Sequence, residues 1–244
     1  MTQDTTHQPV ALITGGSAGL GLVLARFLAA QGYDLILTGR HAGRLDAAVE
    51  AMPSQGEVQG ISGDVAHEGH RRKLAEAVAA RGRLDLLVNN ASLLGPLPMP
   101  QLGDYPPGAL REVLEVNTIA PLALVQSLRP WLANRRGLIV NITSDAALGG
   151  YPAWGGYGAS KAALELLTLT LANELREEGI YAVTVDPGDM RTQMHQDAYP
   201  GEDISDRPLP DVTLPFWAWL LGQKPEEISG QRYQAQAERW EVAT

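Results

Sequence analysis

The segment YGASKAALELL, residues 157–167, places two side chains with acid–base chemistry four positions apart. At this spacing Tyr157 and Lys161 share one face of a helix, so both can point at the same small volume. A free phenol has a pKa of about 10, and a nearby ammonium group favours the phenolate and lowers that pKa. Lysine is rare in this chain, which has three Lys against sixteen Arg. The pair therefore predicts a tyrosine that exchanges protons near neutral pH.

A hydroxyl side chain precedes this pair in the sequence. Ser144 follows the run GLIVNIT, residues 137–143, which is apolar enough to form a buried strand. In parallel α/β sheets the groups that bind ligands gather at the carboxyl ends of the strands. We therefore expect Ser144 to reach the same crevice as Tyr157.

A glycine-rich stretch near the amino end, ALITGGSAGLGLVLARFLA, indicates a second kind of chemistry. Gly15, Gly19 and Gly21 stand between an apolar strand and an amphipathic helix. Glycine permits a tight turn, and the free N–H groups and positive dipole end of the helix can receive a pyrophosphate. Glycine spacing alone is weak evidence, but the order strand, turn, helix predicts a dinucleotide site.

The end of the second predicted strand bears on the choice of dinucleotide. An acidic residue about 20 positions beyond the glycines usually holds the adenosine ribose, whereas an arginine accommodates a 2′-phosphate. This chain has Gly39 at that point, followed by Arg40. We therefore expect NADP(H) to be preferred over NAD(H). The alternative is that Arg40 is an ordinary surface arginine.

Short β-rich runs alternate with helical patterns, which is typical of an α/β, doubly wound, Rossmann-type parallel sheet with helices on both faces. Seven strands are expected, at residues 10–14, 33–38, 57–62, 84–89, 137–143, 181–186 and 231–235. Helices are expected at residues 19–31, 42–51, 67–81, 107–133, 158–178 and 212–222. The pattern predicts one domain, residues 9–244, after a flexible tail, residues 1–8. Residues 189–211, the lid segment below, are polar and contain prolines, and we expect them to form a loop that covers a substrate.

The composition limits the classes of function. The 244 residues suffice for one large core. With 19 basic and 28 acidic residues the net charge is −9, which opposes binding to nucleic acid or to a membrane surface. The chain has no cysteine, which excludes disulfides and thiolate metal sites. No apolar run reaches the ~18 residues of a membrane span. We expect a cytoplasmic protein without a bound metal.

Taken in order, these motifs resemble the short-chain dehydrogenases/reductases, in their simple single-domain branch. The matching residues are TGGSAGLG (14–21), Asp64 and Val65, NNA (89–91), Asn117, Ser144, YGASK (157–161) and PGDMRT (187–192). They cover the chain from about residue 10 to residue 235. Each motif alone is modest evidence, whereas the ordered set is specific.

The resemblance implies an enzyme that transfers a hydride between NADP(H) and a carbonyl or secondary alcohol. Tyr157 would be the general acid in reduction and the general base in oxidation, and Ser144 would polarise the substrate oxygen. Lys161 would bind the nicotinamide ribose, while Asn117 would anchor a water molecule of a proton relay. The residues that would contact the dinucleotide are Gly15, Ser17, Gly19, Leu20, Gly21, Arg40, Asp64, Val65, Asn90, Ala91, Tyr157, Lys161, Pro187, Gly188, Met190 and Thr192.

The resemblance also implies partners. The substrate would be a small carbonyl or alcohol, and the chain would form a homodimer or homotetramer through the helices at 107–133 and 158–178.

Two other functions stay open at this point. A nucleotide-sensing regulatory protein could keep the fold without turnover, although such a protein would usually have lost Tyr157 or Lys161. A sugar-nucleotide epimerase or dehydratase generally has a larger C-terminal substrate region than the roughly fifty residues that follow PGDMRT here.

Four further polar residues are expected to carry no chemistry. His67 and His70 have a possible metal spacing but no third ligand, and we expect them to be solvated. Asp145 is expected to point away from Ser144, because neighbours on an extended strand face opposite sides. His195, in the lid segment, is expected to face water.

The substrate itself is not identified by any motif. Trp154 could form a wall of a hydrophobic substrate site or could pack in the core or at an interface. Residues 93–106 are rich in proline and apolar side chains, which slightly favours a non-polar ligand.

Overall fold

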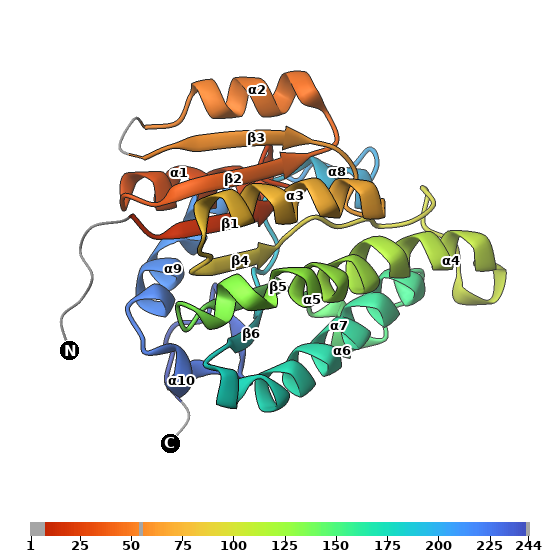
Figure 1. Cartoon of the computed structure of the whole chain (residues 1–244). Coiled ribbons are helices and arrows are strands. Elements are labelled where there is room, and N and C mark those ends of the chain that lie inside the picture. Colours follow the sequence, from red (N-terminus) through yellow and green to blue (C-terminus); the bar gives the residue numbers. More distant parts are fainter. Residues whose placement is uncertain (1–7, 54–55, 243–244) are drawn as a thin grey trace.

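The seven predicted strands form one parallel sheet (Figure 1). The computed structural model describes residues 8–53 and 56–242, so the predicted tail lies outside the described residues except for Gln8. The strands are β1 (Val10–Thr14), β2 (Asp34–Gly39), β3 (Val58–Ser62), β4 (Leu86–Asn89), β5 (Leu138–Ile142), β6 (Tyr181–Asp186) and β7 (Arg232–Gln234). Their order is β3-β2-β1-β4-β5-β6-β7, and every neighbouring pair is parallel. The predicted fold class is confirmed.

The central strands are buried along their whole length, as their continuous apolar sequences predict. Every residue of β1, β4, β5 and β6 is buried, whereas β3 at the edge of the sheet is mostly exposed. The register aligns Asn89 of β4 with Asn141 of β5. The side-chain amide of Asn89 donates to Asn141 Oδ1 at 2.7 Å. These two buried amides join the strands that end beside the site.

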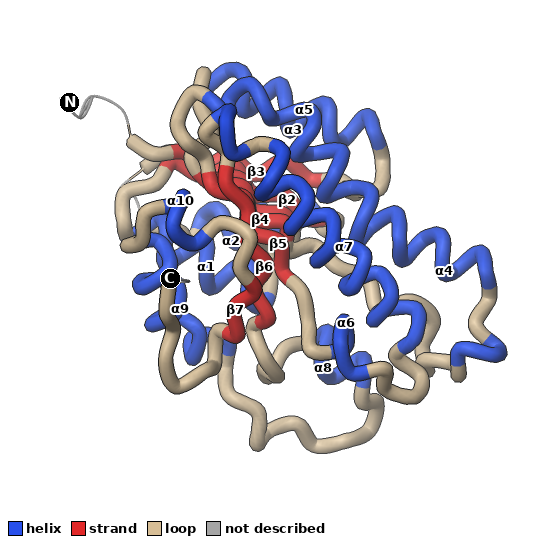
Figure 2. The backbone as a smooth tube through the Cα atoms, turned by 90° about the horizontal axis from the view of Figure 1, so that it is seen from below, coloured by secondary structure: helices blue, strands red, loops and turns tan. Residues whose placement is uncertain are grey.

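Helices cover both faces of the sheet (Figure 2). They are α1 (Gly19–Ala30), α2 (Ala42–Glu50), α3 (Glu68–Arg81), α4 (Pro107–Leu114), α5 (Ala120–Ala133), α6 (Ala146–Gly149), α7 (Gly155–Glu174), α8 (Gln193–Ala198), α9 (Leu214–Leu221) and α10 (Pro225–Ile228). One hydrophobic core lies between the sheet and α1, α2, α9 and α10, and another lies between the sheet and α3, α5 and α7. The short helices α6 and α8 lie beyond one end of the sheet (Figure 2).

The helices differ from the sequence-based expectation in three places. The helix expected at 107–133 consists of α4, the π-helical segment η2 (Glu115–Ile119) and α5. The helix expected at 158–178 begins earlier, at Gly155. The lid segment is not irregular throughout, because α8 lies within it. Helices of four to six residues, such as α6, α8 and α10, carry too little periodicity to be recognised in a sequence.

The order of the strands reverses between β1 and β4. In open α/β sheets ligands bind beyond the carboxyl ends of the strands at such a reversal. The glycine turn after β1 and the loop after β4 therefore lie side by side. In the part of the chain that the structure describes, no helix is long and apolar enough to cross a membrane.

Candidate active site

The turn after β1 is shaped for close approach of the backbone. Gly15 has a φ of +67°, and a Cβ there would lie 2.8 Å from Asn90 Nδ2. A Cβ on Gly21 would lie 2.3 Å from the carbonyl oxygen of Gly15. A side chain at Gly15 would push the turn away from the loop after β4, and one at Gly21 would push α1 away from the turn. The glycines therefore allow the turn to pack against both that loop and the start of α1, whose first N–H groups have no partner within the helix.

The loop after β4 is tied to this turn by Thr14, the last residue of β1. Thr14 Oγ1 accepts hydrogen bonds from the backbone N–H groups of Asn90 and Ala91, both at 2.9 Å. The side chain of Asn90 donates to the Thr14 carbonyl at 2.9 Å. The first two residues of the NNA motif therefore have structural roles. Asn89 is hydrogen-bonded to Asn141 of β5, and Asn90 is hydrogen-bonded to the start of the glycine turn.

The end of β2 lies against the glycine turn at the position of the acidic residue that commonly holds the ribose of NAD(H). A Cβ at Gly39 would lie 2.6 Å from Ser17 Oγ and 3.3 Å from Ser17 Cβ, so a larger residue would require the Ser17 side chain to move. Arg40 and Arg44 both line the cavity here and are exposed. The sequence analysis missed Arg44, which stands in the first turn of α2.

Asp64 and Val65 line the same end of the cavity, as predicted. His67 is exposed, but the expectation that His70 is solvated is wrong. His70 is 7% exposed, and its Nε2 lies 2.7 Å from Thr38 Oγ1. The His70 ring links α3 to the end of β2. The spacing of three residues between His67 and His70 could not indicate this contact.

Tyr157 and Lys161 lie on one face of α7, as their spacing predicts. Both are buried, with exposed fractions of 8% and 1%. The Lys161 Nζ lies 5.5 Å from the centre of the Tyr157 ring and donates to the carbonyl of Ile142 at 2.8 Å. Because Ile142 is the last residue of β5, the amine is held between α7 and the end of that strand.

The charge states of this pair differ from the expectation. Burial raises the pKa of Tyr157 to about 12, although hydrogen bonds with Ser92 and Ser144 act in the opposite direction. Burial also lowers the pKa of Lys161 to about 7. The expected lowering of the Tyr157 pKa is therefore wrong for the protein itself, because desolvation of the phenol outweighs the other effects. At neutral pH the phenol is protonated.

Ser144 lies two residues after the end of β5 and lines the cavity, as predicted. The expectation that Asp145 points away from it is wrong, because Ser144 Oγ donates to Asp145 Oδ1 at 3.0 Å. Asp145 has helical dihedral angles, φ −58° and ψ −26°, and immediately precedes α6. The strand has already ended there, so the alternation of side chains along a strand no longer applies.

Asn117 lies behind the cavity and does not line it. Its amide donates to the Leu93 carbonyl and to Ser160 Oγ, both at 2.9 Å. Its Oδ1 accepts from the Leu93 N–H at 2.8 Å and from Ser92 Oγ at 3.2 Å. Asn117 thereby fixes the loop that presents Ser92 to Tyr157. Ser92 was not predicted as a site residue. The feature of the sequence that could have indicated it is its position directly after the NNA motif.

An ionic cluster lies beneath the same end of the cavity. Arg232 of β7 donates from Nε to Glu165 Oε1 at 2.9 Å and from Nη2 to Asp186 Oδ2 at 3.0 Å. Arg232 also reaches the Ser144 carbonyl at 3.3 Å. Glu165 accepts a further hydrogen bond from Thr143 Oγ1 at 2.6 Å. The guanidinium group therefore joins α7, β6 and the end of β5.

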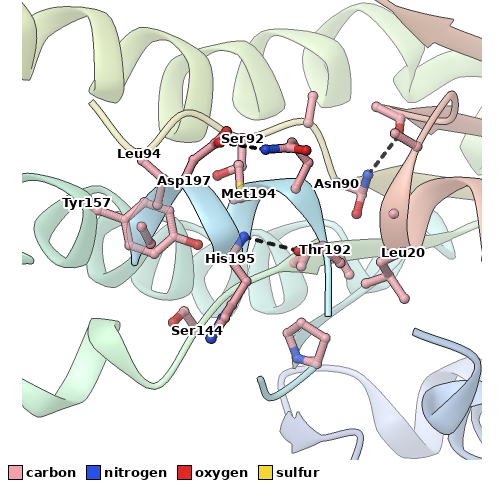
Figure 3. A pocket seen from close by; sticks show the side chains of 18 of the residues that line it. Leu20, Asn90, Ser92, Leu94, Ser144, Tyr157, Thr192, Met194, His195 and Asp197 are labelled. Carbon is pink, nitrogen blue, oxygen red and sulfur yellow. Dashed lines mark hydrogen bonds between the residues drawn. The ribbon is translucent and has the colours of Figure 1, made fainter. Parts of the chain in front are cut away.

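The lid segment places α8 over the substrate end of the cavity (Figure 3). Thr192 caps the helix, and its Oγ1 accepts from the His195 N–H at 3.2 Å (Figure 3). The expectation that His195 faces water is wrong. Its side chain is 11% exposed, its Nδ1 lies 3.8 Å from Asp189 Oδ1, and its ring lies 5.0 Å from that of Tyr199.

Trp154 lines the cavity, which favours its reading as a wall of the substrate site. Its ring packs edge-on against Tyr157, with 5.7 Å between the ring centres, and lies 6.0 Å from Tyr199. Leu94 and Met194 pack in the same small apolar cluster. The walls around the reactive end of Tyr157 are thus aromatic and apolar.

These parts enclose a cavity of about 770 Å³ along the carboxyl ends of the strands. The predicted site residues that line it are Gly15, Ser17, Gly19, Leu20, Arg40, Asp64, Val65, Asn90, Ala91, Ser144, Tyr157, Lys161, Pro187, Gly188, Met190 and Thr192. Gly21 and Asn117 support its walls from behind. Lining residues that were not predicted include His41, Arg44, Ser92 and Tyr151, while Leu94, Met194, Asp197 and Tyr199 come from the two segments, 93–106 and 189–211, that were expected to contact the substrate. They lie on loops and short helices, where side-chain direction depends on the fold.

The fold and this cavity define a Rossmann-type protein with a tyrosine–lysine pair beside a dinucleotide turn. The model of the short chain dehydrogenase family matches residues 9–203. The chain therefore belongs to the short-chain dehydrogenase/reductase family of oxidoreductases, as its motifs indicated.

Similar proteins include both sequence relatives and solved structures. The "uncharacterized oxidoreductase YciK" of Escherichia coli (strain K12) is 30% identical over 97% of this chain and 95% of its own length. The serine 3-dehydrogenase of Agrobacterium fabrum is 34% identical over 75% of this chain and 72% of its own length. A Shigella flexneri 2a protein, solved in complex with NADP, superimposes with a TM-score of 0.87 at 28% identity, covering 97% of this chain and 100% of that chain.

Proposed function

We propose that this protein is an NADP(H)-dependent oxidoreductase that transfers a hydride between the nicotinamide and a carbonyl or secondary alcohol. The observation that carries the proposal is the placement of Tyr157, Ser144 and Lys161 at one end of a cavity whose other end holds the glycine turn. The bound cofactor would supply the hydride chemistry, and the protein would orient it and move the proton.

The lining of the adenosine end fits a phosphorylated dinucleotide. Gly15 and Gly21 allow the turn to pack closely against the loop after β4 and the start of α1, and the start of that helix attracts a phosphate. Gly39 provides no carboxylate for the adenosine ribose, while Arg40 and Arg44 offer two guanidinium groups for a 2′-phosphate. These features support NADP(H) over NAD(H), as does the NADP complex of the Shigella flexneri relative.

The other contacts follow the family resemblance and the lining of the cavity. In this proposal Asp64 and Val65 face the adenine, Asn90 and Ala91 face the neighbouring ribose, and Pro187, Gly188, Met190 and Thr192 face the nicotinamide side. The lid segment closes over the substrate after binding.

Tyr157 is the proton donor in the reduction of a carbonyl. A pKa of about 12 keeps the phenol protonated at neutral pH, which is the form that reduction requires. Ser144 provides a second hydrogen bond to the same substrate oxygen. In oxidation Tyr157 has to act as phenolate, a form that a positively charged, oxidised nicotinamide beside it would favour.

Lys161 and Asn117 complete the proposed machinery. Lys161 points from α7 towards the end of β5 and would hold the hydroxyl groups of the nicotinamide ribose. Asn117 keeps the Ser92 loop in place and, following the family resemblance, would anchor a water molecule that passes protons towards Lys161.

The test replaces the phenol hydroxyl alone. In Tyr157→Phe we expect kcat for ketone reduction to fall by about 10²–10⁴-fold, the usual contribution of a positioned acid, while NADPH affinity measured by fluorescence titration is retained. Tyr105→Phe is the matched control, because Tyr105 is buried but does not line the cavity. Wild-type rates with NADPH should exceed those with NADH.

Retention of most activity by Tyr157→Phe would refute the proposed mechanism. If the wild-type protein binds NADPH but turns over no member of a broad carbonyl and alcohol panel, the nucleotide-sensing alternative is favoured instead.

A further inference from the structure

The substrate end of the cavity has a distinct electrostatic character. Beyond Tyr157 and Ser144 the cavity continues beneath α8, which carries Met194 (Figure 3). Trp154 and Tyr199 also line it, and their rings lie 6.0 Å apart. Aromatic and thioether surfaces of this kind favour a substrate with an apolar or aromatic body.

Besides Asp186, which is paired with Arg232, the acidic side chains that line this compartment are Asp145, Asp189 and Asp197. The arginines that line the cavity are Arg40 and Arg44, and they belong to the opposite end, beside β2. Among the described residues that line the substrate end, Lys161 is therefore the sole lysine or arginine. Its amine is bound to the end of β5 and is 1% exposed.

The three carboxylates differ in their partners. Asp189 is compensated, since it lies 3.6 Å from Arg207 Nε and 3.8 Å from His195 Nδ1. In the described part of the chain, Asp145 and Asp197 form no ion pair. Asp197 accepts from the Gln193 amide at 2.8 Å.

Asp145 is the carboxylate closest in sequence to the proposed chemistry. It accepts from Ser144 Oγ at 3.0 Å and is hydrogen-bonded to Tyr151, and both of these partners are neutral hydroxyl groups. Its negative charge therefore remains at the point where Ser144 would hold the substrate oxygen. Asp145 is exposed, so solvent screens its charge in part, but a carboxylate next to the reacting carbonyl would still lie beside a like charge, which is unfavourable.

We propose that the substrate is a ketone or secondary alcohol with an apolar or aromatic body and no carboxylate beside the reacting carbon, and that Asp145 rejects the carboxylate-bearing analogues. This inference rests on the proposed function and names its substrate class. It separates this chain from the serine 3-dehydrogenase relative, whose name specifies an amino acid and hence a carboxylate.

The experiment uses pairs of substrates that differ in one charge. Ethyl benzoylformate and benzoylformate present the same aryl ketone with and without a neighbouring carboxylate, and ethyl acetoacetate with acetoacetate forms a second, smaller pair. We expect kcat/KM with NADPH to favour the ester in each pair by at least about 100-fold in the wild-type protein.

The role of Asp145 is tested by Asp145→Asn, which keeps an oxygen acceptor for Ser144 and removes the charge. Because esters are intrinsically more reactive ketone substrates, the decisive quantity is the change in the ester-to-acid ratio, which we expect to fall roughly tenfold in this variant. Asp211→Asn is the control, since it removes the same charge at an exposed position outside the cavity and should leave the ratio unchanged.

Three outcomes are distinguishable. A wild-type preference for the acids, or an unchanged ratio in Asp145→Asn, would overturn this inference while leaving the proposed function intact. A wild-type kcat/KM for the esters at least about 100-fold above that for the acids, and a lowered ratio in Asp145→Asn, would support it. If no carbonyl is reduced with either cofactor, the proposed function fails and this inference falls with it.

Discussion

Lys161 shows how strongly burial controls single residues in this site. Its side chain is 1% exposed, its amine has one protein hydrogen bond, to the Ile142 carbonyl, and its pKa is lowered to about 7. An amine that titrates near neutrality can bind a ribose hydroxyl either as a donor or as an acceptor. The same desolvation keeps the Tyr157 phenol protonated, so both residues are held in their neutral forms above neutral pH.

The lowered pKa of Lys161 predicts a specific dependence of stability on pH. Between pH 7 and pH 10.5 the unfolded chain keeps the proton that the folded chain has released, so the free energy of unfolding rises with pH. Below pH 7 both states are protonated and the burial penalty is fully present. Relative to Lys161→Met, the wild-type protein should therefore gain about 1.4 kcal/mol of unfolding free energy per pH unit between pH 8 and 9.5.

Urea unfolding of both proteins at three pH values checks this slope, and Tyr157 does not interfere because its pKa lies above the window. Parallel pH curves for the two proteins would show that Lys161 keeps an ordinary pKa.

Sequence reasoning succeeded at the residue scale where spacing alone fixes geometry. Tyr157 and Lys161 had to share a helix face, and the glycine turn had to follow a strand. It failed where direction or solvation depends on the rest of the chain. Asp145 turned towards Ser144 because the strand ends one residue earlier than the alternation assumed, and His195 is covered because α8 folds over the cavity.

At the scale of elements, the ionic cluster around Arg232 positions three parts of the site. Arg232 connects Glu165 on α7 with Asp186 at the end of β6, and it contacts the carbonyl of Ser144. Glu165 lies eight residues after Tyr157, on the same face of the helix. The cluster therefore holds the reactive face of α7 at a fixed position relative to the ends of β5 and β6.

Arg232→Met should lower the free energy of unfolding by about 2–4 kcal/mol, because two largely buried carboxylates lose their cation. Arg129→Met is the control, since it breaks an exposed pair with Glu178 and should cost at most about 1 kcal/mol. Equal losses in the two variants, measured by urea unfolding at pH 7, would show that the cluster adds no more than a surface pair.

The elements themselves were largely predictable. All seven strands were found to within one or two residues, because buried parallel strands have continuous apolar sequences. The ionic cluster around Arg232 could not be predicted from the sequence. Its members come from positions 165, 186 and 232, and only the order of the strands in the sheet brings them together. Residues 189–211 were expected to cover a substrate as a loop, but the helix α8 within them was not foreseen, because six residues carry too little periodicity.

For the whole molecule, self-association remains a prediction. The family resemblance implies a dimer or tetramer through the helices at 107–133 and 158–178, and α7 carries the exposed side chains Leu166 and Leu169, 67% and 46% exposed. Replacing both by Glu should convert an oligomer to monomers in light scattering at micromolar concentration, because charge in an apolar contact is costly. Leu209→Glu, at an exposed position in the lid segment, is the control and should leave the mass unchanged. A monomeric wild-type protein would contradict the prediction.

The reversal of strand order between β1 and β4 divides the cavity between two stretches of chain. The glycine turn and the arginines that would select the coenzyme come from residues before 92, whereas Ser144, Tyr157 and α8 come from residues after 143. Mutations in the later stretch, away from Lys161 and residues 187–192, can thus accumulate during descent and alter what is oxidised or reduced, while the coenzyme stays the same. This division of the cavity therefore favours the evolution of related proteins that act on different substrates but use the same coenzyme.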